Sequence, residues 1–204
     1  KAAALSYEGS EVTYRELDEQ SNRLARLLIG RGIGPESVVA LALARSPESV
    51  LSLWAVAKTG AAFVPVDPNY PTDRIVHMLS DSGAALALTV AEFRPTLPDC
   101  TSYVVVDAPG FDDEVSAHSA AVVTDADRTH PLALENPAYL IYTSGSTGTP
   151  KCRRHPPRPG ELRDRRTRPL RGHPAVAHAA LLVAELRRVD PGTAAWRSAP
   201  ARPW

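Results

Sequence analysis

The chain has 204 residues and carries 23 basic and 23 acidic side chains, so its formal net charge is zero. This balance argues against a polybasic nucleic-acid binder and against an acidic disordered chain. The zero is, however, the sum of two opposite parts. Residues 1–151 carry 11 basic and 19 acidic side chains, whereas residues 152–204 carry 12 arginines and 4 acidic side chains. We therefore treat the segments before and after Lys151 as different in kind.

Other global features exclude further classes of protein. No apolar run approaches the roughly 18 residues of a membrane helix, and no basic stretch followed by an apolar one marks a signal peptide. Cys100 and Cys152 are too few for a disulfide framework and lack the spacing of metal ligands. These features predict a cytoplasmic protein without a membrane partner. Because the chain begins at Lys1 rather than methionine, we expect it to be a fragment of a longer one.

The first 106 residues show an alternation of strand and helix patterns. We expect a hairpin over residues 5–14 and then a helix ending near Gly30, because leucines recur at helical spacing. Further on we expect strands over 37–44, 62–66, 85–90 and 103–106, with helices over 47–59 and 72–82. Thr72 or Asp73 is the expected cap of the last helix. The alternation predicts βαβ units on a largely parallel sheet, and hence an α/β fold.

Residues 107–136 are acidic and irregular, and we expect them to form a surface excursion. An apolar strand over 137–142 follows and leads directly into a loop in which every residue from Thr143 to Thr149 is Thr, Ser or Gly. Pro150 and Lys151 complete this loop. Small residues let backbone N–H groups converge on an anion, and hydroxyl groups and a lysine add further donors. The loop therefore suits a polyphosphate.

The loop differs from two familiar nucleotide-binding motifs. In the P-loop, four residues separate a first glycine from the sequence Gly-Lys-Ser/Thr. Here Pro150 precedes Lys151, and Cys152 follows it. The dinucleotide fingerprint does not fit either. A flexible Ser/Gly/Thr linker is the plainest alternative, and the position of the loop immediately after an apolar strand argues against it.

Three segments, in order, resemble core motifs of the adenylate-forming (AMP-binding) superfamily, and of the amino-acid adenylation domains of nonribosomal peptide synthetases in particular. The run from Tyr142 to Lys151 resembles the phosphate-binding signature of the superfamily. Residues 12–17 (VTYREL) resemble the first core motif of adenylation domains, and residues 57–71 (AKTGAAFVPVDPNYP) resemble the second. For these two motifs we expect structural roles, with Tyr14 and Leu17 anchoring the helix to the hairpin and Pro65 and Pro68 shaping a strand exit. We assign no role to His77.

The resemblance implies a fold and a reaction. Residues 1–151 would form the start of the large N-terminal subdomain of such an enzyme. The domain would use ATP and Mg²⁺ to convert an amino acid to aminoacyl-AMP and pyrophosphate. The product would then pass to the phosphopantetheine thiol of a carrier protein, in a synthetase that also holds condensation domains. The ATP-binding residues implied are those of the loop: Thr143, Ser144, Gly145, Ser146, Thr147, Gly148 and Lys151. Later segments of the family pattern, including its catalytic lysine, are missing, so we expect this chain to be inactive alone and assign it no catalytic or metal-binding residue.

Residues 152–204 depart from the family pattern, which continues after the lysine with glycine, several valines and Thr-His. The segment contains no Ile, Phe, Tyr, Asn, Gln, Lys or Met, which is typical of a GC-rich gene read out of frame. When the residues from Cys152 onward are translated back into their possible codons and these are read one nucleotide later, the shifted codons can encode VVVTHRGLGN. From His178 onward the shifted codons permit a segment that resembles the next family motif, whose substrate-binding aspartate would be encoded across Arg187 and Arg188. We therefore interpret residues 152–204 as an out-of-frame, unstructured tail.

Three other interpretations remain open. The arginine- and proline-rich tail could be a basic arm of a polyanion-binding module, disordered or marginally helical over 175–188, although few aromatic residues are available to stack on bases. We therefore expect no nucleic-acid partner. The parent protein could also be an acyl- or aryl-acid ligase of the same superfamily. Finally, the reading frame could be as given, which would make the chain a natural truncation.

Overall fold

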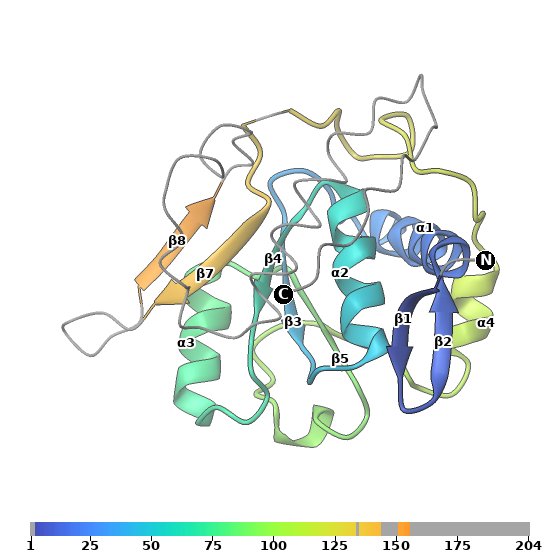
Figure 1. Ribbon diagram of the computed structural model, residues 1–204. Coiled ribbons are helices and arrows are strands. Elements are labelled where there is room, and N and C mark those ends of the chain that lie inside the picture. The colour runs from blue at the N-terminus through green and yellow to red at the C-terminus, as the bar shows by residue number, and fades with distance from the viewer. Residues whose placement is uncertain (1–2, 134, 144–150, 156–204) are drawn as a thin grey trace, which may run out of the picture.

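The computed structural model describes residues 3–133, 135–143 and 151–155, and these form helices packed on both faces of a β-sheet (Figure 1). The sheet has six strands in the order β6-β5-β3-β4-β7-β8. Five of them run parallel, and only β8 is antiparallel to its neighbour. The predicted α/β class and largely parallel sheet are confirmed.

Each predicted strand and helix of the first 106 residues is present. The strands are β1 (Ala3–Tyr7), β2 (Ser10–Thr13), β3 (Val38–Ala42), β4 (Ala62–Pro65), β5 (Leu86–Thr89), β6 (Tyr103–Val105), β7 (Tyr139–Thr143) and β8 (Lys151–His155). The helices are α1 (Tyr14–Gly30), α2 (Pro47–Thr59), α3 (Thr72–Ser82) and α4 (Phe111–Ser116), with a short 3₁₀ turn at Arg94–Thr96.

The N-terminal hairpin and α1 are shaped by local hydrogen bonds. Glu8 and Gly9 both have positive φ, as the two central residues of a tight hairpin turn require. Thr13 caps α1 in a reciprocal arrangement, since its hydroxyl accepts from the Glu16 N–H while its own N–H donates to the Glu16 carboxylate. Leu17 is buried, as expected of an anchor, whereas Tyr14 is 52% exposed, so burial supports the predicted anchoring role for Leu17 only.

The two crossover helices begin differently. Ser46 and Ser49 form a second capping box at the start of α2, and Gly60 in the left-handed conformation ends that helix. The predicted cap of α3 was wrong. Its N-cap is Pro71, whose ring has no group that could cap the helix, and Thr72 already lies inside the helix.

The core divides between the two faces of the sheet. One face of β3, including Val39 and Leu41, packs under α1 and α2. The other face, including Ala40, packs under α3 through Ile75 and Met78. Burial on both faces explains why β3 reads as an unbroken apolar run. The result is a three-layer α/β/α arrangement, as Figure 1 shows.

Residues 107–136 are more ordered than predicted. They contain α4, and the segment after it lies along α1, where two arginines hold it. Arg23 donates to the carbonyl groups of Ser116 and His118, and Arg26 donates to those of Ser119, Ala121 and Val122. The backbone carbonyl groups of this irregular segment thus accept hydrogen bonds from arginine side chains rather than from the backbone of a neighbouring strand.

The C-terminal limit of the described fold also differs from the prediction. The boundary was expected at Lys151, but β8 continues to His155, antiparallel to β7. Four residues assigned to an unstructured tail therefore lie in a strand. The rest of that segment, 156–204, lies outside the described residues.

Candidate functional site

The predicted phosphate loop is the connection between β7 and β8. Thr143 and Lys151, its first and last members, are register partners across the antiparallel pair. The remaining predicted site residues lie outside the described residues: Ser144, Gly145, Ser146, Thr147 and Gly148. The structure therefore brings the two ends of the loop together and fixes where the loop leaves the sheet.

The loop leaves the sheet at the carboxyl end of a parallel strand. β7 runs parallel to β4, so the loop emerges at the edge of the sheet where the carboxyl ends of the parallel strands lie. In open α/β sheets this edge is where ligands bind. The loop predicted to bind phosphate therefore starts at the ligand-binding edge of the sheet.

Tyr142 ties the end of β7 to α3, a contact that the sequence analysis missed. Its hydroxyl lies 2.7 Å from Asp81 Oδ2 and 3.2 Å from the Met78 carbonyl oxygen. Burial, together with the hydrogen bond to Asp81, raises the pKa of Tyr142 well above its usual range. His77, to which no role was assigned, stands edge-on to the Tyr142 ring at a centroid distance of 6.2 Å. Strand alternation places Tyr142 on the α3 face, but no pattern in the sequence identifies Asp81 as its partner.

The motif at residues 57–71 has structural roles, as predicted. Lys58 donates to the Asp18 carboxylate at 2.7 Å and to the Asn22 side-chain oxygen at 2.7 Å, which joins α2 to α1. Burial lowers the pKa of Lys58 despite this ion pair. After β4, the Asp67 carboxylate accepts from the backbone N–H of Asn69 and forms a tight turn.

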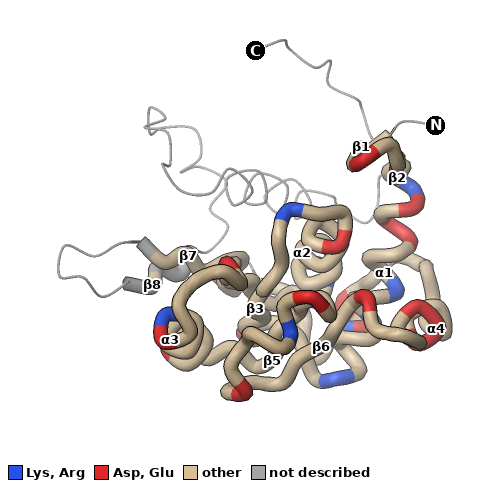
Figure 2. The backbone as a smooth tube through the Cα atoms, turned by 90° about the horizontal axis from the view of Figure 1, so that it is seen from below, with Lys and Arg blue, Asp and Glu red and all other residues tan. Residues whose placement is uncertain are grey.

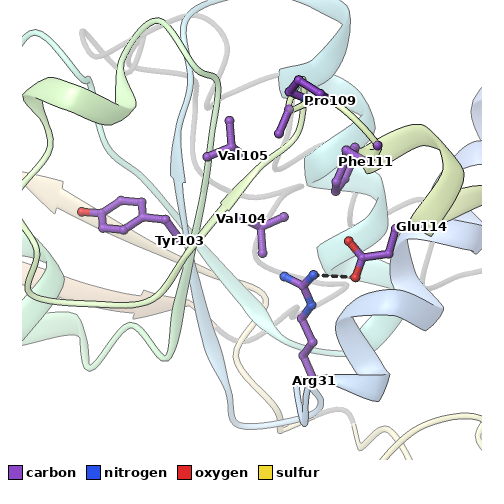
Figure 3. A pocket seen from close by; sticks show the side chains of 9 residues that line it. Arg31, Tyr103, Val104, Val105, Pro109, Phe111 and Glu114 are labelled. Carbon is purple, nitrogen blue, oxygen red and sulfur yellow. Dashed lines mark hydrogen bonds and ion pairs between the residues drawn. The ribbon is translucent and has the colours of Figure 1, made fainter.

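A surface pocket of about 360 Å³ lies beside β6, which is the edge strand on the other side of the sheet from β8. Figure 3 shows Arg31 and Glu114 meeting in it at 2.7 Å, next to Val104 and Phe111. Because the guanidinium is already paired with Glu114 and the other lining residues are uncharged, this pocket offers little to a phosphate. We therefore place the candidate site at the β7–β8 loop.

The described residues offer no preformed metal site. Among residues 3–133, 135–143 and 151–155, no group of three or more His, Cys, Asp or Glu could hold an ion. Within the same ranges, no helix is long and apolar enough to cross a membrane. Figure 2 shows acidic positions spread along the described backbone, and Asp112, Asp113 and Glu114 lie together in the first turn of α4.

Comparison with known proteins gives consistent similarities. The family model described as "AMP-binding enzyme" matches residues 1–155. A dimodular nonribosomal peptide synthase of Bacillus subtilis (strain 168) is 46% identical over 152 residues, which are 74% of this chain and 6% of that protein. Novobiocin biosynthesis protein H of Streptomyces niveus is 44% identical over 150 residues, 72% of this chain and 25% of that protein. The chain thus spans at most a quarter of these relatives.

Solved structures agree with the sequence matches. The Klebsiella oxytoca NpsA N-terminal subdomain has a TM-score of 0.61 at 28% identity, covering 74% of this chain and 37% of that one. The Brucella canis acyl-CoA synthetase gives 0.61 at 25% identity, covering 72% and 28%. The described fold therefore matches part of the N-terminal subdomain of such enzymes.

Proposed function

The chain belongs to the AMP-binding enzyme family, and we propose that it supplies the ATP-phosphate-binding segment of an amino-acid-adenylating domain of a nonribosomal peptide synthetase. The observation that carries this proposal is the hairpin of β7 and β8. It closes a Gly/Ser/Thr loop between Thr143 and Lys151 at the ligand-binding edge of a parallel sheet. The backbone and hydroxyl donors of the loop contact the β- and γ-phosphates, and Lys151 neutralises their charge.

The reaction we propose for the parent domain is attack of an amino-acid carboxylate oxygen on the α-phosphorus of ATP. A new oxygen–phosphorus bond forms, the bond to the bridging oxygen breaks, and pyrophosphate leaves with the electron pair. Magnesium has its usual oxygen ligands on the phosphates of ATP.

An amino acid is the substrate class that the observations favour. Residues 57–71 match the peptide-synthetase form of the second core motif, and two relatives at 43–46% identity are peptide synthetases by name. The likeness to an acyl-CoA synthetase concerns the fold that the two branches share. Peptidyl carrier and condensation domains are the partners this proposal implies, and the carrier's phosphopantetheine thiol receives the aminoacyl group.

Phosphate binding by the loop can be tested on the 204-residue chain. Equilibrium dialysis or calorimetry with Mg·ATP should show binding that pyrophosphate competes away. Lys151→Ala should weaken it by about tenfold, because a cation beside the phosphates is lost. Arg45→Ala removes an exposed cation that follows β3 and should change the affinity by less than twofold. Equal losses in the two variants, or preferential binding of RNA with a steep salt dependence, would favour the polyanion-binding interpretation instead.

A further inference from the structure

We propose that Tyr142 is a positioning residue that fixes the base of the phosphate loop by attaching the end of β7 to α3. We call Tyr142, Met78 and Asp81 together the Tyr142 clamp. This inference rests on the proposed function of the loop, but its geometry is independent of any ligand.

The end of β7 needs such an attachment because its pairing with β4 is short. The only register pair recorded between the two strands is Phe63 with Tyr139, at the start of β7. Further along, β4 ends at Pro65, which has no N–H to donate to a ladder. On its other side β7 pairs only with β8, which is the edge strand of the sheet. Within the described residues, the last part of β7 is therefore held by an edge strand and by side chains.

Tyr142 provides the attachment one residue before the loop begins. Its single hydroxyl proton faces two acceptors on α3, the Asp81 carboxylate at 2.7 Å and the Met78 carbonyl at 3.2 Å. A hydrogen bond to a charged acceptor is stronger than one between neutral groups. A tyrosine hydroxyl is protonated at physiological pH, and burial raises the pKa of Tyr142 further, so the group remains a donor.

Both strands of the hairpin take part in this contact. Cys152 is the register partner of Tyr142 on β8, and both side chains pack against the core cluster beneath α3. The next register pair is Thr143 with Lys151, where the loop starts and ends. Fixing Tyr142 therefore fixes the separation and direction of the two loop ends, and donors held in place in advance bind an anion at a smaller entropic cost.

The test uses hydrogen exchange and Mg·ATP binding in the 204-residue chain. Tyr142→Phe keeps the ring but removes the hydroxyl, and Asp81→Ala removes the acceptor from an exposed position on α3. Tyr139→Phe is the matched control. It is the same substitution on the same strand, but its ring faces Phe63 in the core on the opposite side of the sheet. Melting temperatures of all variants report whether the fold as a whole is retained.

We expect amide exchange across residues 143–151 to become about tenfold faster in Tyr142→Phe and in Asp81→Ala. The double variant should be no faster than Tyr142→Phe alone, since that substitution already removes the hydroxyl that bonds both acceptors. Mg·ATP affinity should fall by a similar factor in these variants and by less than twofold in Tyr139→Phe. Unchanged exchange at 143–151 in both single variants would overturn the clamp, whatever happens to ATP binding. Faster exchange in a chain that binds no ATP would support the clamp and count against the proposed function.

Discussion

Gly60 shows how one residue of a family motif is required by the fold rather than by chemistry. Its φ of +88° ends α2 in the left-handed region, and an added Cβ would lie 3.0 Å from Pro35 Cγ and 3.2 Å from Leu132 Cδ1. Gly83 ends α3 with a φ of +65°, but nothing lies within 4 Å of an added Cβ. The two glycines thus share a backbone requirement and differ in the space around them.

This difference predicts the cost of substitution. Gly83→Ala should lower the free energy of unfolding by about 1 kcal/mol, the cost of a left-handed conformation for a residue with a Cβ. Gly60→Ala should cost at least about 1 kcal/mol more, because two side chains must also move. Urea unfolding of both variants measures the difference. Equal losses would mean that the close packing at Gly60 is not limiting.

Lys58 is a second residue of the same motif with a structural role. Burial lowers the pKa of its ammonium group below 10.5 even though Asp18 pairs with it. The unfolded chain therefore binds more protons than the folded one between the two pKa values, and stability rises with pH in that window. Relative to Lys58→Met, the wild-type free energy of unfolding should increase as the pH approaches 10.5 from below. A decrease would show that the ion pair, and not desolvation, dominates at this site.

At the scale of elements, the segment after α4 depends on α1 for its order. Arg26 contacts three backbone carbonyl groups of this segment and the Asp127 carboxylate, whereas Arg31 forms only a half-exposed pair with Glu114. Arg26→Ala should cost about 1.5 kcal/mol, because three carbonyl groups and the Asp127 carboxylate together lose a charged donor. Arg31→Ala should cost less than about 1 kcal/mol, as is usual for surface pairs. Chemical unfolding gives both values, and similar ones would contradict the assigned roles.

Asp127 makes the same segment sensitive to acid. Its pKa is lowered, chiefly by the backbone N–H of Thr124 and also by Arg26. The stability that Asp127 contributes is therefore fully present above the unfolded-state pKa, near 3.8, and is lost as the pH falls through the lower folded-state pKa. In Asp127→Asn this part of the acid sensitivity should disappear, as a comparison of unfolding free energies between pH 5 and pH 2 would show. Identical pH profiles for the two proteins would contradict the prediction.

The sequence predicted elements better than it predicted contacts between them. Apolar runs and glycine stops located β3, α2 and β4, because burial on two faces and left-handed helix ends leave clear local signals. The excursion over 107–136 was predicted to be irregular, since bonds from Arg23 and Arg26 to its carbonyl groups leave no periodic pattern. The Asp81 partner of Tyr142 lies 61 residues away and was invisible for the same reason.

At the scale of the whole molecule, the neutral total charge is the sum of two parts with net charges of opposite sign. The acidic part, residues 1–151, lies entirely within the match to the family model, which covers residues 1–155. We propose that the arginine-rich part results from a shift of reading frame after Lys151. Removing one extra nucleotide, or supplying two missing ones, around codons 148–155 should then give a continuation that resembles the family. A confirmed reading frame as printed would leave a natural truncation as the explanation.

The central claim, that the β7–β8 loop is the phosphate site of an amino-acid-adenylating domain, is tested most directly by exchange of pyrophosphate into ATP. The assay uses the protein translated in the restored frame and compares pooled amino acids with fatty and aryl acids. We predict exchange that depends on an amino acid, falls by at least about tenfold in Lys151→Ala and is retained in Arg45→Ala. Exchange with fatty or aryl acids only, or exchange indifferent to Lys151, would contradict the account.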